Sequence, residues 1–164
     1  MTVRVVLLMG VSGSGKTTVG SLLAQSLGWT YADADSFHSV ENVAKMAADQ
    51  PLSDQERAPW LQAIRAWIDD RVLKGEHAVV GCSALKRAYR DVLRRPEVSF
   101  VYLRGTRAEI ATRLAARAGH FFKPSMLDSQ FDVLEEPTAD EDVLTVSIDK
   151  MPDEIVAAII KARL

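Results

Sequence analysis

The chain has 164 residues, which is enough for one domain and hardly enough for two. Hydrophobic residues make up 48% and charged residues 26%, the proportions of an ordinary globular protein. The formal net charge of -2 argues against a strongly basic nucleic-acid binder. The single cysteine, Cys82, cannot form an intrachain disulfide, which indicates a reducing compartment.

The first apolar segment of the chain does not read as a targeting or membrane segment. Residues 3–9 are far fewer than a bilayer span requires. They also run directly into a glycine-rich turn, without the small-residue cleavage site of a signal peptide. We therefore expect a cytoplasmic protein with neither nucleic acid nor membrane among its partners.

Apolar segments alternate with helical patterns along the chain. Strands are expected at residues 3–9, 29–33, 78–82, 98–103 and 142–148. Continuous apolar runs such as the first are typical of parallel strands that are covered on both faces. The pattern predicts an α/β fold with a five-stranded parallel sheet and helices on both faces.

Several helix ends are marked in the sequence. A helix is expected over about 16–27, with Gly28 as its stop. Ser53, Thr106 and Ser125 are each followed three residues later by an acid, the pattern of a capping box. Pro152 suits the first turn of a C-terminal helix.

Residues 10–17 satisfy the phosphate-loop pattern G-x-x-x-x-G-K-[ST] between the first strand and the first helix. The glycines let backbone N–H groups approach phosphate oxygens, Lys16 reaches the β- and γ-phosphates, and the Thr17 hydroxyl can ligate Mg²⁺. The sequence therefore predicts a P-loop NTPase fold that binds ATP and Mg²⁺, with Lys16 also catalytic. The expected nucleotide-binding residues of the loop and the helix start are Gly10, Ser12, Gly13, Ser14, Gly15, Lys16, Thr17 and Thr18.

Three classes of nucleotide-binding protein are compatible with such a loop: a kinase, a guanine-specific switch or a motor ATPase. The N-K-x-D stretch of a switch is not present in the sequence. The third predicted strand ends in Cys82 and Ser83 and not in the acidic Mg²⁺ ligand of a motor ATPase. These features, together with the length, favour a small-molecule kinase.

Two acidic residues follow the second predicted strand. Asp33 and Asp35 alternate along the chain, so they lie on one side, about 7 Å apart. If the strands are parallel, this end opens into the same crevice as the phosphate loop. One carboxylate near Mg²⁺ and one near an acceptor hydroxyl is the arrangement that phosphoryl transfer requires. His38 is either a substrate-binding group or a helix-entry residue.

Sequence stretches spread over nearly the whole chain match one known family. They are residues 8–16, 33–38, 42, 45–46, 51–52, 54, 57, 59–61, 82–86, 89–91, 119–122, 129–131 and 134–137. On these stretches the chain resembles the gluconate kinases of the thermoresistant type, within the shikimate- and adenylate-kinase-like group. It departs from their pattern at Ser39, where proline is usual, and at Asp49, where glycine is frequent.

The resemblance implies ATP-dependent phosphorylation of D-gluconate at its 6-hydroxyl, a nucleoside-kinase-like fold and a homodimer. By that similarity Asp33 holds Mg²⁺ through water, and Asp35 orients and deprotonates the acceptor hydroxyl. His38, Arg57 and Lys86 are implied to contact the sugar acid. Two other readings stay open at this point: a kinase of shikimate or a nucleoside monophosphate, and a nucleotide-dependent binding module.

Charge and position add detail on the acceptor side. Arg57 lies near the first turn of a capped helix, where a cation is electrostatically out of place, and this favours a ligand role. Lys86 and Arg90 are four residues apart and can share a helix face, with Lys86 expected to point into the crevice. Ser83 is a candidate hydroxyl donor, and His120 is counted with the substrate-binding residues.

A basic stretch at residues 113–123 is interrupted by Gly119. We expect residues 117–125 to form a lid over the triphosphate, which excludes water and stabilises the transferring charge. Resemblance to nucleoside-kinase-like lids places Arg117 on the γ-phosphate as a catalytic residue and Arg113 nearer the adenine. The whole chain, residues 1–164, is then one kinase domain, in which helices over about 38–74 bind the acceptor.

Overall fold

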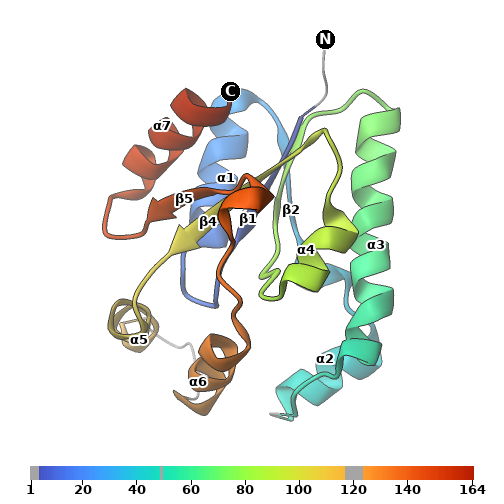
Figure 1. Cartoon of the computed structure of the whole chain (residues 1–164), viewed down its shortest axis with the longest axis vertical. Coiled ribbons are helices and arrows are strands. Elements are labelled where there is room, and N and C mark those ends of the chain that lie inside the picture. The colour runs from blue at the N-terminus through green and yellow to red at the C-terminus, as the bar shows by residue number, and fades with distance from the viewer. Residues whose placement is uncertain (1–3, 49, 117–123) are drawn as a thin grey trace.

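The computed structural model describes residues 4–48, 50–116 and 124–164, and Figure 1 shows their arrangement. The sheet consists of β1 (Val5–Met9), β2 (Thr30–Asp33), β3 (Ala78–Gly81), β4 (Val98–Arg104) and β5 (Leu144–Ser147). Its strands pair in parallel, in the spatial order β2-β3-β1-β4-β5. The predicted five-stranded parallel sheet is confirmed, with each strand end within two residues of its expected position.

Helices cover both faces of the sheet. On one face lie α1 (Lys16–Leu27) and α7 (Pro152–Arg163), and on the other α3 (Asp54–Leu73) and α4 (Arg87–Leu93) (Figure 1). The helices α2 (Val40–Ala47), α5 (Arg107–Ala115) and α6 (Pro124–Val133) gather below the carboxyl ends of the strands (Figure 1). Two short 3-10 turns complete the described elements, η1 (Ala34–Phe37) and η2 (Ala139–Glu141).

The central strand β1 is buried on both sides and separates two hydrophobic clusters. Val6 and Leu8 belong to the cluster under α1 and α7, whereas Leu7 and Met9 belong to the cluster under α3 and α4. Successive side chains of a strand point to opposite faces, which is why an uninterrupted apolar run is needed here. This double burial fixes the position of the loop that follows Met9.

The helix ends follow the expected signals in all but one case. Ser53 and Thr106 cap α3 and α5 with both hydrogen bonds of the capping box. Gly28 ends α1 in a left-handed conformation, and Pro152 opens α7. The expected start at Ser125 is wrong, because α6 begins at Pro124 and Ser125 lies inside its first turn.

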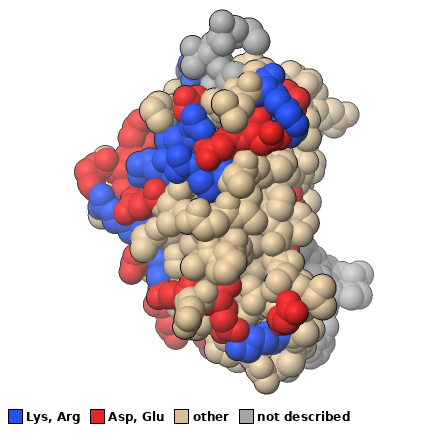
Figure 2. Space-filling view, turned by 90° about the vertical axis from the view of Figure 1, so that its right-hand side faces the viewer, with Lys and Arg blue, Asp and Glu red and all other residues tan. Residues whose placement is uncertain are grey.

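On the face that carries α3, basic and acidic side chains are mixed in two groups, and an uncharged band separates the two groups (Figure 2). Ion pairs of α3 account for part of this pattern, among them Arg65 with Asp69 and Arg71 with Asp70. None of the helices in the described ranges is both long and apolar enough to cross a membrane.

Candidate active site

A cavity of about 460 Å³, here called the main cavity, opens at the carboxyl ends of β1, β2 and β3. In a parallel sheet the carboxyl ends of the strands share one edge. Ligands bind at this edge where the chain connections lead to opposite sides, and here β3 and β4 lie on opposite sides of β1. The main cavity brings together most of the side chains singled out from the sequence: Ser12, Gly13, Gly15, Lys16, Thr17, Asp33, Asp35, His38, Arg57 and Ser83. Of the other described candidates, Gly10, Ser14, Thr18, Lys86 and Arg113 lie outside its lining.

The phosphate loop has the backbone conformation that its glycines allow. Gly15 precedes α1 with a φ of 99°, a left-handed value that strains other residues. Gly10 has a φ of 149°, and a Cβ there would lie 2.9 Å from the Leu103 carbonyl oxygen. Lys16 Nζ donates to the carbonyl oxygens of Gly10 (2.8 Å) and Val11 (3.1 Å). The ammonium group therefore lies across the loop.

The amino end of α1 is directed at this loop and carries no acidic residue in its first turn. The partial positive charge of the helix end is therefore available to an anion. The Ser14 hydroxyl is turned inward: the residue is 1% exposed, and its oxygen has no hydrogen-bond partner among the described residues. The Ser14 backbone N–H donates to the Val11 carbonyl oxygen at 3.2 Å, which closes the turn of the loop.

Two hard oxygen ligands converge beside the loop. Thr17 Oγ1 donates to Asp33 Oδ2 at 3.5 Å, and Asp33 Oδ1 accepts from the Asp35 N–H at 2.9 Å. No cluster of three or more His, Cys, Asp or Glu side chains that could hold a metal ion occurs in the described part of the chain. Mg²⁺ in phosphoryl-transfer sites usually keeps several waters and takes only one or two protein ligands beside the phosphates. The Thr17 and Asp33 pair fits that requirement.

Asp35 belongs to η1 and lines the main cavity. The surrounding protein displaces water from its carboxylate, and this raises the pKa of Asp35 above its ordinary value. The negative charge of Asp33 raises the pKa further, while Lys16 and His38 lower it. A raised pKa makes a carboxylate a better proton acceptor, as a general base requires.

His38 packs flat on Trp60, with ring centroids 4.2 Å apart and an interplanar angle of 10°. Trp60 Nε1 donates to the Ala34 carbonyl oxygen at 2.7 Å, which fixes the indole under η1. Burial lowers the pKa of His38, and the Arg57 charge lowers it too, while Asp35 opposes both. At neutral pH the imidazole is therefore a neutral hydrogen-bonding group on the cavity wall.

Arg57 lines the main cavity, and its guanidinium is hydrogen-bonded to a tyrosine. Its Nη1 donates to the Tyr89 hydroxyl at 3.1 Å, and that hydroxyl donates to Asp54 Oδ1 at 2.5 Å. Lys86 Nζ donates to the same carboxylate, at 3.0 and 3.2 Å. The two expected substrate cations thus differ: Arg57 faces the cavity, whereas the Lys86 ammonium is paired with Asp54.

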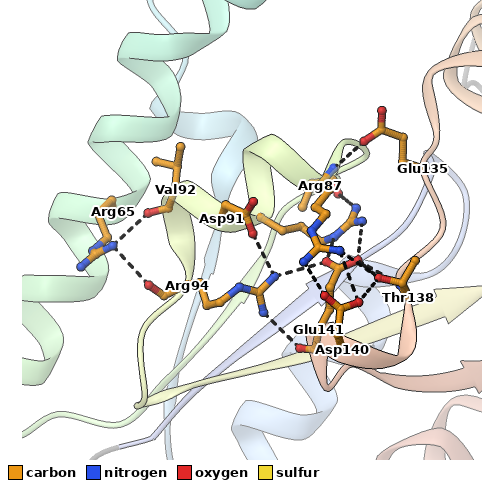
Figure 3. A network of polar contacts seen from close by, with 11 residues as sticks. Arg65, Arg87, Asp91, Val92, Arg94, Glu135, Thr138, Asp140 and Glu141 are labelled. Carbon is orange, nitrogen blue, oxygen red and sulfur yellow. Dashed lines mark hydrogen bonds and ion pairs between the residues drawn. The ribbon is translucent and has the colours of Figure 1, made fainter.

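Arg90 does not share the surroundings of Lys86. Its side chain is fully buried, with Nε 2.7 Å from Glu141 Oε1, and its Nη1 donates to the Ala84 carbonyl oxygen at 2.9 Å. Figure 3 shows the network in which α4 and the segment around η2 are joined. Ala84 has a φ of 45°, so this network holds a left-handed residue directly after Ser83.

The expected lid lies mostly outside the described residues, and so do Arg117 and His120. Arg113, on α5, is described and lies beside the phosphate loop. Its Nη2 donates to the Ile148 carbonyl oxygen, just after β5. Its Nη1 would be 3.5 Å from a Cβ at Gly15.

Comparisons with known proteins agree with this geometry. The sequence profile of the shikimate kinase family matches residues 12–162. The thermoresistant gluconokinase of Escherichia coli strain K12 is 46% identical over 161 residues, which cover 96% of this chain and 92% of that protein. The chain belongs to the gluconokinases of the shikimate kinase family.

Solved structures place this gluconokinase-family chain in the same fold. A crystal structure of a gluconokinase from Sinorhizobium meliloti 1021 superposes with a TM-score of 0.85 at 40% identity, covering 95% of this chain and 89% of that one. A sugar kinase from Janibacter sp. HTCC2649 superposes with a TM-score of 0.91 at 42% identity, covering 97% and 93%. The P-loop kinase fold and the family resemblance inferred from the sequence are confirmed.

Sequence reasoning missed two contributors to the site. Tyr89 and Gln130 lie in stretches that carry the family resemblance, but those stretches assign them no role. Tyr89 joins Arg57 to Asp54, and Gln130 contacts the phosphate loop from α6. Both contacts are made between elements far apart in the sequence, so no local pattern signals them.

Proposed function

We propose that this gluconokinase-family protein transfers the terminal phosphoryl group of ATP to the 6-hydroxyl of D-gluconate, giving 6-phospho-D-gluconate and ADP. One observation carries the proposal: the phosphate loop, the Asp35 carboxylate and the Arg57 guanidinium line the same cavity. A phosphate site, a base and a cation for an acid substrate are the groups that such a transfer needs.

The nucleotide side is formed by the loop and by α1. Backbone N–H groups of Gly13 and of residues 15–17 face the β- and γ-phosphates, and Lys16 leaves the Gly10 carbonyl oxygen to pair with them. Thr17 and Asp33 would hold Mg²⁺, and the bound ion would neutralise phosphate charge. Ser14, Thr18 and Arg113 are further nucleotide-binding residues that the sequence predicts.

The acceptor side is organised around Asp35. The carboxylate accepts the proton of the 6-hydroxyl while the bond from that oxygen to phosphorus forms and the bond from phosphorus to the β–γ bridging oxygen breaks. ADP leaves with the bridging oxygen and its electron pair. The raised pKa of Asp35 makes its carboxylate a better acceptor for this proton.

Gluconate has a carboxylate at one end and hydroxyl groups along its chain. Arg57 is placed to pair with the carboxylate, and its Tyr89 contact restricts the guanidinium to one orientation. His38 and Ser83 line the main cavity and offer hydrogen bonds to these hydroxyl groups. Lys86 reaches the sugar acid only by exchanging its Asp54 partner for it.

The lid completes the proposal with Arg117 on the γ-phosphate and His120 on the acceptor. Exclusion of water by such a segment limits hydrolysis of ATP in the absence of acceptor. The lid, a homodimer and a cytoplasmic location are predictions from the sequence and its resemblance.

The decisive experiment measures ADP release with Mg-ATP and, separately, D-gluconate, shikimate, AMP or no acceptor. We expect a large stimulation by gluconate alone, with the product identified by ³¹P and ¹H NMR as the 6-phosphate. Stimulation by shikimate or AMP instead would keep the mechanism and discard the substrate. No stimulation by any acceptor would leave a nucleotide-binding protein without this transferase activity.

A further inference from the structure

Both ends of the Gln130 amide, on α6, are hydrogen-bonded to one residue of the phosphate loop. The Ser12 backbone N–H donates to Gln130 Oε1 at 2.7 Å, and Gln130 Nε2 donates to the Ser12 hydroxyl oxygen at 2.9 Å. The two residues are 118 positions apart in the sequence. In Figure 1 α6 lies below the carboxyl ends of the strands, and this contact joins it to the loop that follows β1.

The direction of the first hydrogen bond fixes the direction of the second. A backbone N–H can only donate, so the amide atom that faces it must be the oxygen of Gln130. The other amide atom is then the NH₂ group, which donates to Ser12 Oγ. Because Ser12 Oγ accepts this bond, its own proton must point away from Gln130.

Ser12 and Gln130 both line the main cavity, next to Gly13 and Lys16 of the phosphate loop. We propose that Gln130 is a positioning residue for phosphoryl transfer, which engages the Ser12 N–H and turns the Ser12 hydroxyl into a donor toward the transferring phosphoryl group. The inference rests on the proposed function. Fixed donors that face developing negative charge are effective because they need no reorganisation during the reaction.

The same amide also faces the acceptor. A second cavity of about 260 Å³ adjoins the main cavity, and its lining includes Leu52, Arg57 and Gln130. The amide nitrogen of Gln130 has a second N–H, which its bond to Ser12 does not use. Gln130 therefore lies between the phosphate loop and the region where Arg57 meets the sugar acid.

Other contacts hold α6 in place without Gln130. Leu127 is 5% exposed and belongs to the hydrophobic core. Asp128 pairs with Arg107 of α5 at 3.1 Å, and the Glu135 N–H, just after the helix, donates to the Leu85 carbonyl oxygen at 2.8 Å. Removal of the Gln130 side chain is thus expected to leave the helix docked.

The test compares Ser12→Ala, which keeps the backbone N–H and removes the hydroxyl, with Gln130→Ala. We expect each to lower kcat about tenfold or more, while the KM for ATP changes by less than about threefold. The double variant should be no slower than Ser12→Ala, because Gln130 acts through that hydroxyl. Asp132→Asn, at an exposed position of the same helix, is the matched control and should keep the wild-type kcat.

The variant Gln130→Glu distinguishes orientation of the Ser12 hydroxyl from mere attachment of α6 to the phosphate loop. A glutamate still accepts from the Ser12 N–H, but its carboxylate cannot donate to Ser12 Oγ and instead draws the hydroxyl proton toward itself. At saturating ATP and gluconate we expect kcat to fall at least as far as in Gln130→Ala. Wild-type kcat in Gln130→Glu would show that the contact only attaches α6, and would overturn the inference.

Two further outcomes are distinguishable. If the wild-type protein phosphorylates gluconate and Ser12→Ala keeps its full kcat, the inference is wrong and the proposed function stands. This arm does not depend on whether Gln130→Ala folds. If the wild-type protein does not phosphorylate gluconate, the proposed function fails. The same variants are then compared for ATP hydrolysis to water, and equal rates there also overturn the inference.

Discussion

Arg90 and Glu141 form an ion pair in the interior, with the Arg90 side chain 0% and the Glu141 side chain 1% exposed. Arg90 Nε lies 2.7 Å from Glu141 Oε1, and Nη2 lies 3.1 Å from Oε2. This contact lowers the pKa of Glu141 to about 2. The pair connects α4 to the segment around η2, and Arg90 Nη1 also donates to the carbonyl oxygen of Ala84, the residue after Ser83.

Arg90→Met should therefore destabilise the protein strongly. It removes one partner of the pair and leaves the Glu141 carboxylate buried without its cation, which typically costs about 3–5 kcal/mol of unfolding free energy. Urea denaturation followed by circular dichroism measures the change. The control is Arg87→Met, whose pair with Asp140 is exposed and should change the midpoint little. Equal midpoints for both variants would contradict the role of the buried pair.

Asp35→Asn should abolish most turnover and leave nucleotide binding intact. The amide has nearly the same shape as the carboxylate but cannot accept the acceptor's proton, and loss of a general base lowers kcat by about 10²- to 10⁴-fold. Steady-state kinetics with gluconate measures kcat, and fluorescent-nucleotide titration measures ATP affinity. Lys16→Ala provides the contrast, because it should weaken both. Unchanged kcat in Asp35→Asn would remove Asp35 as the base.

The pH dependence of kcat should report the surroundings of Asp35. Burial and the charge of Asp33 raise its pKa, whereas Lys16 and His38 oppose the shift. The base works only when ionised, so kcat falls as pH decreases through the raised pKa. We expect the acid limb to lie above about pH 4, the value for an ordinary aspartate. A limb at or below that value would contradict the shift.

His38 is the other group that can titrate in this range, and it needs a control. Burial lowers its pKa below the ordinary histidine value of about 6.5. His38→Gln retains a hydrogen-bonding side chain and removes the titration. The acid limb should persist in His38→Gln if Asp35 is its source, and it should vanish if His38 is.

The parts of the site that are formed by residues close together in the chain can be predicted from the sequence. The phosphate loop, the first helix and the Asp33 and Asp35 pair each follow from neighbouring residues, and the strand ends place them at one edge. Contacts between distant elements were not predictable in the same way. Lys86 was expected in the crevice because it follows β3, yet its ammonium is paired with Asp54 of α3.

The burial of the Arg90 charge is likewise not predictable from the sequence. A helical spacing of four places it near Lys86 on α4, but the partner that draws it into the interior, Glu141, lies 51 residues further along the chain. Gln130 likewise contacts Ser12 across 118 positions. Periodicity assigns a residue to a helix face, whereas the partner of a buried polar group depends on tertiary packing.

Arg57→Ala should weaken gluconate binding selectively. Arg57 is the cation of α3 that lines the main cavity, and loss of a charge-assisted hydrogen bond of about 1.5–3 kcal/mol corresponds to a rise in the gluconate KM of about 10- to 150-fold. The KM for ATP should change little, because the phosphate loop is untouched. Initial rates at varied gluconate and fixed saturating ATP measure the effect.

Two variants make this last prediction specific. Tyr89→Phe removes the hydroxyl that accepts from Arg57 Nη1, so it should raise the gluconate KM in the same direction but less, since the guanidinium stays and only its orientation is freed. Lys74→Ala removes an exposed cation at the far end of α3 and should leave both KM values unchanged. If Arg57→Ala behaved like Lys74→Ala, the carboxylate of the substrate would have to be bound elsewhere. Lys86, released from Asp54, would then be the group to test.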